Sequence, residues 1–162
     1  MIVVANASPL ISLSSVGALD LLQSLYRTIS IPEAVYAEIV VAGAGRAGSA
    51  EVAAAMWIQH RPVANTTAVN QLMTIAKLSA GESETLILAT ELKADLIIID
   101  ERPARRHALA QGLPIIGTLS VLLLAKSQGL LPEVKPLLNS LSAAGMRLSP
   151  MLYAETLRRA GE

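Results

Sequence analysis

The sequence predicts a three-layer α/β/α sandwich, in which helices cover both faces of a central, mainly parallel sheet of four or five strands. Short, almost purely apolar runs alternate with segments that have apolar residues at helical spacing, which is typical of a parallel sheet buried on both faces. Of the 162 residues, 52% are hydrophobic and 16% are charged, so the chain can bury such a sheet. The length fits one domain, and we expect residues 1–162 to form it.

The predicted strands are short runs rich in Val, Ile and Leu, bounded by residues typical of turns. Because proline donates no backbone hydrogen bond, Pro62 restricts the third run to an edge of the sheet. The runs are residues 2–5, 28–31, 57–63, 96–99 and 113–116.

Several of the predicted helices have recognisable ends. Gly17 separates the first two, Pro32 starts the third, and Ser79 with Glu82 matches a capping pattern. The predicted helices are residues 10–16, 19–26, 33–40, 51–56, a segment beginning at residue 79, 103–111, 119–128, 132–141 and 151–160. The Gly- and Ala-rich residues 42–49 predict a mobile loop. We expect the C-terminal helices within residues 132–160 to pack on the core or in a dimer.

Charge and residue usage exclude several classes of protein. The 13 basic and 13 acidic residues give a formal net charge of +0, so no global field favours nucleic acid or a membrane surface. Cysteine is absent, which excludes thiolate metal sites and is compatible with the cytoplasm. Scarce aromatic residues disfavour RNA binding by base stacking. The apolar runs are too short to span a membrane, and the apolar excess predicts a homodimer.

Polar residues follow the predicted strands. Asn6 comes directly after the first strand, and Asp100 and Glu101 come after the fourth. Glu38 lies in the helix after the second strand, and Glu82 opens the helix that leads into the fourth. Ligands of such sheets bind beyond the carboxyl ends of the strands, and hard divalent ions prefer oxygen ligands. The expected ligands of Mg²⁺ or Mn²⁺ are Asn6, Glu38, Glu82 and Asp100, with Glu101 as an additional or alternative ligand.

Five segments, in order along nearly the whole chain, resemble the PIN-domain family. They are Val3-Val4-Ala5-Asn6-Ala7-Ser8-Pro9-Leu10-Ile11, Pro32-Glu33-Ala34-Val35-Tyr36-Ala37-Glu38, Gly81-Glu82-Ser83-Glu84, Ile99-Asp100-Glu101-Arg102 and Gly117-Thr118-Leu119. The chain looks like a little-characterised bacterial branch related to the toxin ribonucleases of toxin–antitoxin pairs. The resemblance implies a metal-dependent endoribonuclease that acts on RNA and has an antitoxin protein as a possible partner.

The resemblance also assigns roles to residues. Acidic residues are implied at the positions of Asn6, Glu38, Glu82 and the pair Asp100-Glu101. Asn6 stands where most nucleases of the superfamily have aspartate, and because an amide adds no negative charge, weaker metal affinity follows. Glu101 also stands where aspartate is usual, and which residue of the pair faces the metal stays open.

Glu82 and Glu84 are two residues apart on a predicted helix, so their side chains point in different directions. The family register favours Glu82 for the site, and Glu84 is expected to lie in solvent. Either carboxylate near a helix start is also favoured by the helix dipole alone.

Other candidate residues have structural alternatives. Asn6 and Ser8 would serve equally as turn and helix-cap residues, and Glu38 as a charge on an exposed face. Ser8 and Thr118 are candidates for orienting water or phosphate, although both also make good caps. His60 and His107 fit no metal spacing and are expected to be ordinary surface or packing residues.

Arg102, Arg105 and Arg106 follow the acidic pair. They would either bind RNA phosphates beside the metal or form ion pairs on a solvated face.

Three hypotheses follow for the function. The first is a metal-dependent endoribonuclease of PIN type, with the toxin of a toxin–antitoxin pair as one form of it. The second is a weakly active or inactive PIN fold that binds nucleic acid or protein, suggested by Asn6 and the neutral net charge. The third is a different phosphohydrolase that uses the same crevice.

Overall fold

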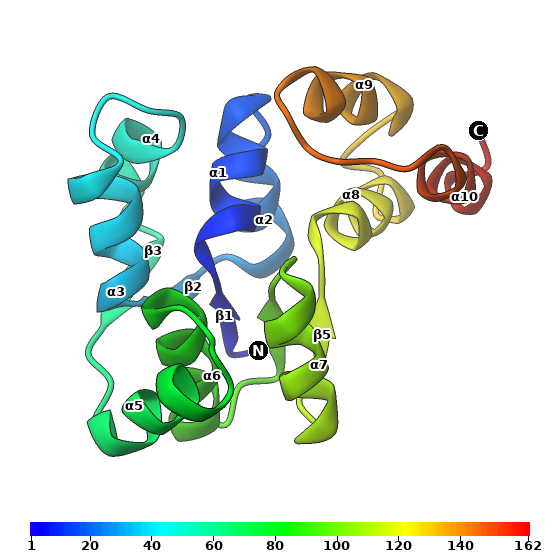
Figure 1. The fold of residues 1–162 in the computed structure, drawn as a ribbon. Helices are drawn as coiled ribbons and strands as arrows, with labels where there is room; N and C mark the ends of the chain where they lie inside the picture. The colour runs from blue at the N-terminus through cyan, green and yellow to red at the C-terminus, as the bar shows by residue number, and fades with distance from the viewer.

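The computed structural model describes residues 1–162, and its centre is a sheet of five parallel strands in the order β3-β2-β1-β4-β5 (Figure 1). The first strand lies in the middle, and the chain adds strands on both sides of it. The strands are β1 (Val3–Ala5), β2 (Ile29–Pro32), β3 (Ile58–Arg61), β4 (Leu96–Ile98) and β5 (Ile115–Ile116). The predicted parallel sheet is confirmed, and β3 lies at the edge that Pro62 requires.

Two helix boundaries form at capping residues that the sequence indicated. Ser79 and Glu82 form a reciprocal capping box at the start of α6, and Gly17 at a φ of 69° separates α1 from α2. The helices are α1 (Ala7–Ser15), α2 (Asp20–Tyr26), α3 (Glu33–Tyr36), α4 (Ser49–Ala54), α5 (Thr66–Ile75), α6 (Ala80–Leu92), α7 (Arg102–Ala110), α8 (Thr118–Ser127), α9 (Lys135–Ala143) and α10 (Pro150–Ala160), with a π-helical segment η1 (Ala37–Ala42) after α3.

Helix α5 is absent from the elements predicted above. Its start is capped by Asn65, whose side chain accepts a hydrogen bond from the backbone N–H of Ala68 at 3.0 Å. Val69 is buried, Leu72 packs against the hydrophobic cluster that contains residues of α6, and α5 as a whole contacts α6. The π-helical segment η1 was not predicted either. Pro32 ends β2 and caps α3, one position earlier than expected.

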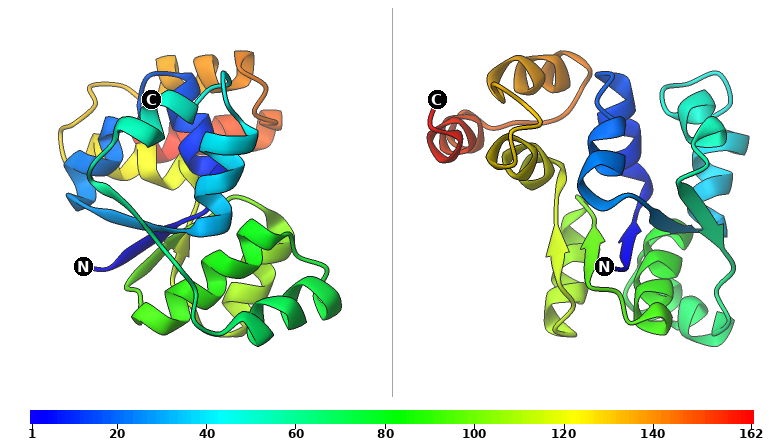
Figure 2. Two further views of the ribbon diagram at one scale, coloured as in Figure 1. Left: turned by 90° about the vertical axis from the view of Figure 1, so that its left-hand side faces the viewer. Right: turned by 180° about the vertical axis from the view of Figure 1, so that it is seen from behind.

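Two hydrophobic clusters, one on each face of the sheet, establish the three layers. Side chains of successive strand residues point to opposite faces, so Val3 and Ala5 join one cluster and Val4 joins the other. The larger cluster contains residues of α1, α2, α8 and α9, and the smaller one residues of α6 and α7. Figure 2 shows these two helical layers above and below the strands. The predicted α/β/α sandwich is therefore confirmed.

The C-terminal helices belong to the larger cluster. Leu138 and Leu141 of α9 are buried in it, and α10 packs on α8. Glu162 accepts hydrogen bonds from the backbone N–H groups of Val134 and Lys135 and pairs with Lys126 at 2.8 Å, which joins the end of the chain to α8 and to the start of α9. None of the helices combines the length and the apolar character that crossing a membrane requires.

Candidate metal centre

The candidate residues lie where the parallel strands β1 and β4 end. Asn6 directly follows β1, and its backbone N–H donates to the carbonyl of Ile98 in β4 at 2.9 Å. Asp100 and Glu101 follow β4 by two and three residues. Because the carboxyl ends of neighbouring parallel strands meet at one edge, residues that are more than 90 positions apart lie together there.

Asn6 is buried, with 3% of its surface exposed, and its amide joins two elements. The Nδ2 atom donates to Oε2 of Glu101 at 2.9 Å. The Oδ1 atom lies 3.3 Å from the hydroxyl of Thr85 in α6, and the single proton of that hydroxyl has a closer acceptor in the carbonyl of Gly81 at 2.7 Å. Asn6 precedes α1 but makes no side-chain cap bond. The alternative reading of this side chain as a helix cap is therefore wrong. Its amide is oriented by tertiary contacts.

Glu101 accepts hydrogen bonds from two side chains of the N-terminal segment. Asn6 bonds one carboxylate oxygen, and the hydroxyl of Ser8 bonds the other. The carboxylate is partly buried against the start of α1. The structure thus places Glu101, and not Asp100, in direct contact with Asn6.

Glu38 reaches the same space from η1. A Cβ atom built on Gly81 would lie 3.0 Å from Oε2 of Glu38 and 3.6 Å from Oδ1 of Asn6. Glycine therefore leaves open a space that two oxygens from different elements border. Partial burial raises the pKa of Glu38, and the charges of Glu101 and Glu82 raise it further. Glu38 is thus close enough to these two carboxylates to be repelled by them.

The side chain of Asp100 contacts the start of helix α8. Its two carboxylate oxygens accept from the backbone N–H and the hydroxyl of Thr118, at 2.8 and 2.6 Å, at the start of α8. Burial raises the pKa of Asp100, while the Thr118 hydrogen bonds and Arg105 act in the opposite direction and Glu101 adds to the rise. Each oxygen of Asp100 therefore accepts one hydrogen bond from Thr118, which directs this carboxylate toward α8.

Glu82 and Glu84 each accept a hydrogen bond from a backbone N–H group at the start of a helix. One oxygen of Glu82 accepts from the backbone N–H of Ser79 at 3.1 Å and closes the capping box of α6. Glu84 accepts from the backbone N–H of Ala34 at 2.8 Å, at the start of α3. The prediction that Glu84 lies in solvent is wrong, because this carboxylate caps a helix that is remote in the sequence.

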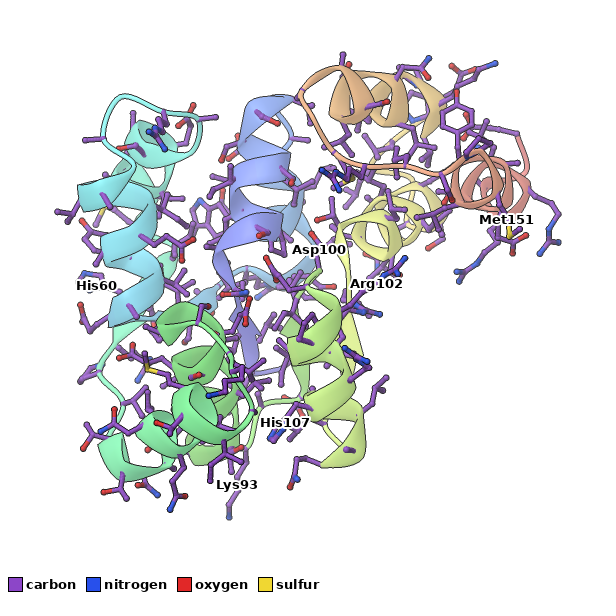
Figure 3. All side chains as sticks on the ribbon, viewed as in Figure 1. His60, Lys93, Asp100, Arg102, His107 and Met151 are labelled. Carbon is purple, nitrogen blue, oxygen red and sulfur yellow. The ribbon has the colours of Figure 1, made fainter.

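The arginines and histidines lie around this centre. Arg105 donates from Nη1 to the carbonyl of Ile99 at 2.7 Å, while Arg102 is exposed at the start of α7. Figure 3 shows Asp100 and Arg102 near the start of α7, with His60 and His107 well apart from both. His60 stacks on Tyr36 with ring centroids 4.2 Å apart. The histidines are thus outside the site, as predicted.

Three residues of the site were not among the candidates. The hydroxyl of Thr85 lies 3.3 Å from the amide oxygen of Asn6, and Gly81 leaves the space beside that oxygen open. Gly117 approaches Asp100 so closely that a Cβ atom there would lie 2.7 Å from Oδ1. Thr85 follows Gly81 by one helical turn, so both face the same direction. A glycine and a threonine four residues apart near the start of a predicted helix were the signal available in the sequence.

The donor set suits a hard divalent ion that keeps other ligands. No group of three or more His, Cys, Asp and Glu side chains is close enough to hold an ion alone. The oxygens that border the Gly81 space are one carboxylate and one amide, with Glu101 hydrogen-bonded to that amide. Mg²⁺ and Mn²⁺ are commonly held by one or two carboxylates together with water and phosphate oxygens. The residues therefore fit such an ion.

Fold and site together define an α/β protein with polar oxygens gathered at the carboxyl edge of a parallel sheet. A sequence model of a family described as "PIN domain" matches residues 2–162. The chain therefore belongs to the PIN-domain family, and the fold is that of PIN-type nucleases. None of the curated proteins compared with the chain matches it.

Proposed function

We propose that the chain is a metal-dependent endoribonuclease of PIN type, which hydrolyses RNA phosphodiesters with Mg²⁺ or Mn²⁺. The observation that supports this most directly is the space beside Gly81, which oxygens of Glu38 and Asn6 border. Glu101 is fixed next to them by Asn6 and Ser8. The proposed metal ligands are Asn6, Glu38 and Glu101, with Glu82 and Asp100 as further acidic residues of the site.

The chain's own residues would act by position and charge. The amide of Asn6 is held by its Nδ2 hydrogen bond to Glu101, so its oxygen is oriented before any ligand arrives and stays available to one. The raised pKa of Glu38 reflects burial and negative charges that a cation would offset. When bound, a divalent ion supplies an activated water and a counter-charge for the leaving oxygen.

The second group of proposed residues would bind the substrate. Arg102 is exposed at the start of α7 and is free to contact a phosphate. Arg105 uses Nη1 for the carbonyl of Ile99 and has other donors remaining. Ser8 and Thr118 donate to Glu101 and Asp100, so their first role is to orient these carboxylates, and a phosphate oxygen would compete for the same hydroxyls.

Cleavage of RNA in Mn²⁺ tests the proposal. We expect the wild-type protein to cut RNA, Glu101→Gln to lose most of the activity, and Asp100→Asn to be impaired through the start of α8. Glu133→Gln removes an exposed carboxylate outside the site and serves as the control. Equal activity in wild type, Glu101→Gln and Asp100→Asn would refute the assigned roles.

A second candidate function has one specific observation in its favour. The amide of Asn6 donates a hydrogen bond to Glu101, which ties up a carboxylate oxygen that a metal would otherwise use. A PIN fold that binds RNA or protein without cutting is compatible with that contact. Asn6→Asp separates the two functions. If it raises Mn²⁺ affinity and cleavage, the native site is an attenuated nuclease, whereas absence of any metal binding in calorimetry favours the binding module. Assays with nucleotides beside RNA would detect a different phosphohydrolase.

The biological setting completes the proposal. The protein would act as one domain over residues 1–162, in the cytoplasm, as the toxin of a toxin–antitoxin pair and as a homodimer. Light scattering tests the dimer. Co-purification with the product of a small neighbouring gene, together with relief of RNA cleavage by that product, tests the antitoxin.

A further inference from the structure

A groove of about 660 Å³ leads away from the candidate metal centre. Asp100, Glu101 and Ser8 line one end of it. From there it runs between α1 and the segment that connects α9 to α10, where Met146 and Arg147 line it. In Figure 1 this connecting segment passes beside the upper part of α1. The groove is therefore continuous with the site, and its volume lies in the range of about 300–1,000 Å³ that ligand pockets have.

The wall that α1 contributes combines three serines with the apolar side chain of Ile11. Ser8, Ser12 and Ser15 are spaced by four and three residues and so lie on one face of the helix, toward the groove. The hydroxyls of Ser8 and Ser15 donate to Glu101 and to the carbonyl of Ser12, so the Ser12 hydroxyl is the one free to donate to a phosphate oxygen. The short serine side chains also allow a sugar–phosphate backbone to approach closely. Ala144 and Gly145 on the opposite wall are also small.

Arg147 is the one cationic residue that lines the groove. Its side chain is exposed, and none of the three ion pairs in the structure includes it. The groove is therefore lined both by the carboxylates that would hold a metal cation and by the guanidinium of Arg147, which forms no ion pair. A polyanion with one phosphate at the metal and another farther along would satisfy both.

We propose that this groove receives the single-stranded RNA adjoining the phosphodiester that is cut, and that Arg147 contacts a phosphate of that stretch. The inference rests on the proposed ribonuclease function. A single strand is the occupant because a double helix is far wider than a groove between one helix and one connecting segment. Arg147 is a substrate-positioning residue and takes no part in the chemical step.

The test compares Arg147→Gln with wild type in cleavage of a labelled single-stranded RNA in Mn²⁺, and in binding of the same RNA by fluorescence anisotropy at several salt concentrations. We expect KM and Kd to rise about threefold to fivefold, the worth of one exposed ion pair. The slope of log affinity against log salt should fall by about 0.7, the value for one phosphate contact on a single strand. We expect kcat and Mn²⁺ affinity to stay unchanged and Arg147→Lys to recover part of the loss.

Lys135→Gln is the matched control, because this exposed cation lies at the other end of α9 and does not line the groove. If Arg147→Gln has the KM, Kd and salt slope of wild type, or if Lys135→Gln loses as much, the inference is overturned while the ribonuclease function stands. If wild type cuts no RNA, the proposed ribonuclease function fails, and the anisotropy measurement tests separately whether the groove binds RNA. RNA binding that weakens in Arg147→Gln supports the groove as an RNA site, and absence of RNA binding by wild type overturns it.

Discussion

Gly81 leaves open the space that Glu38 and Asn6 border, so a methyl group placed there tests whether that space belongs to a metal. In Gly81→Ala the new Cβ atom would lie 3.0 Å from Oε2 of Glu38 and 3.5 Å from Cγ2 of Val35. The close neighbour is the end of a flexible side chain. Glu38 therefore shifts by a few tenths of an ångström, and the fold survives.

The expected effects on stability and on metal binding have opposite signs. Alanine is favoured over glycine in a helix by about 0.5–1 kcal/mol, which raises the Tm of a chain of this length by about 1–4 °C when no metal is present. Displacing Glu38 from a ligand position should weaken Mn²⁺ binding about 10- to 100-fold, as the loss of a supporting contact does in other metal sites. A more stable protein that binds metal less well is the diagnostic result.

Isothermal titration with Mn²⁺ and thermal denaturation in chelator measure the two effects. The control is Ser83→Ala, two residues along the same helix, where the buried hydroxyl has no hydrogen-bond partner. Ser83→Ala should raise Tm, because it removes a buried hydroxyl that has no hydrogen-bond partner. It should leave the Mn²⁺ affinity unchanged, because this hydroxyl does not border the space beside Gly81. If Gly81→Ala binds Mn²⁺ as tightly as wild type, the assignment of this space to a metal is refuted. The same holds if Ser83→Ala loses as much Mn²⁺ affinity as Gly81→Ala.

Three further predictions concern the supporting structure. Lys126 and the backbone N–H groups at the start of α9 lower the pKa of Glu162 to about 2 from 4.5, so its stabilisation is present above about pH 4.5 and is lost as the pH falls toward 2. Glu162→Gln should lower Tm at pH 7, and the difference from wild type should shrink between pH 5 and about 2; a difference that does not change with pH would contradict this. Leu138→Ala, at a fully buried position in α9, should cost about 2–5 kcal/mol in urea denaturation, and a loss below about 1 kcal/mol would place α9 outside the core. Gly117→Ala would bring a Cβ atom to 2.7 Å from Oδ1 of Asp100, and the disturbed hydrogen bonds to Thr118 should cost about 1–3 kcal/mol, with unchanged stability as the contrary result.

The fold was predictable because strand and helix signals agree along most of the chain. The run Leu96–Ile98 lies between helices and reads as a buried parallel strand, which it is. Helix α5 gave a weaker signal, because Thr66, Thr67 and Thr74 have low helix propensity. Its cap by Asn65 and its packing on α6 stabilise it, and packing on another element is not visible in a local pattern.

The proximity of the candidate residues was predictable, but their contacts were not. Residues after β1 and β4 had to meet at one edge of a parallel sheet, which the sequence pattern alone indicates. The choice between Asp100 and Glu101 depends on which partner each one meets. Thr118 bonds the first, and Asn6 with Ser8 bonds the second. Glu84 likewise caps α3, which is 50 residues away in the sequence.

The most direct test of the central claim is a crystal structure of the protein soaked in Mn²⁺, with the ion located by its anomalous scattering. We predict an ion beside Gly81 that is bonded to oxygens of Glu38, Glu101 and Asn6, with the Asn6–Glu101 hydrogen bond broken or rearranged. An empty space beside Gly81 at saturating Mn²⁺, or an ion bound only elsewhere on the molecule, would contradict the proposed metal centre.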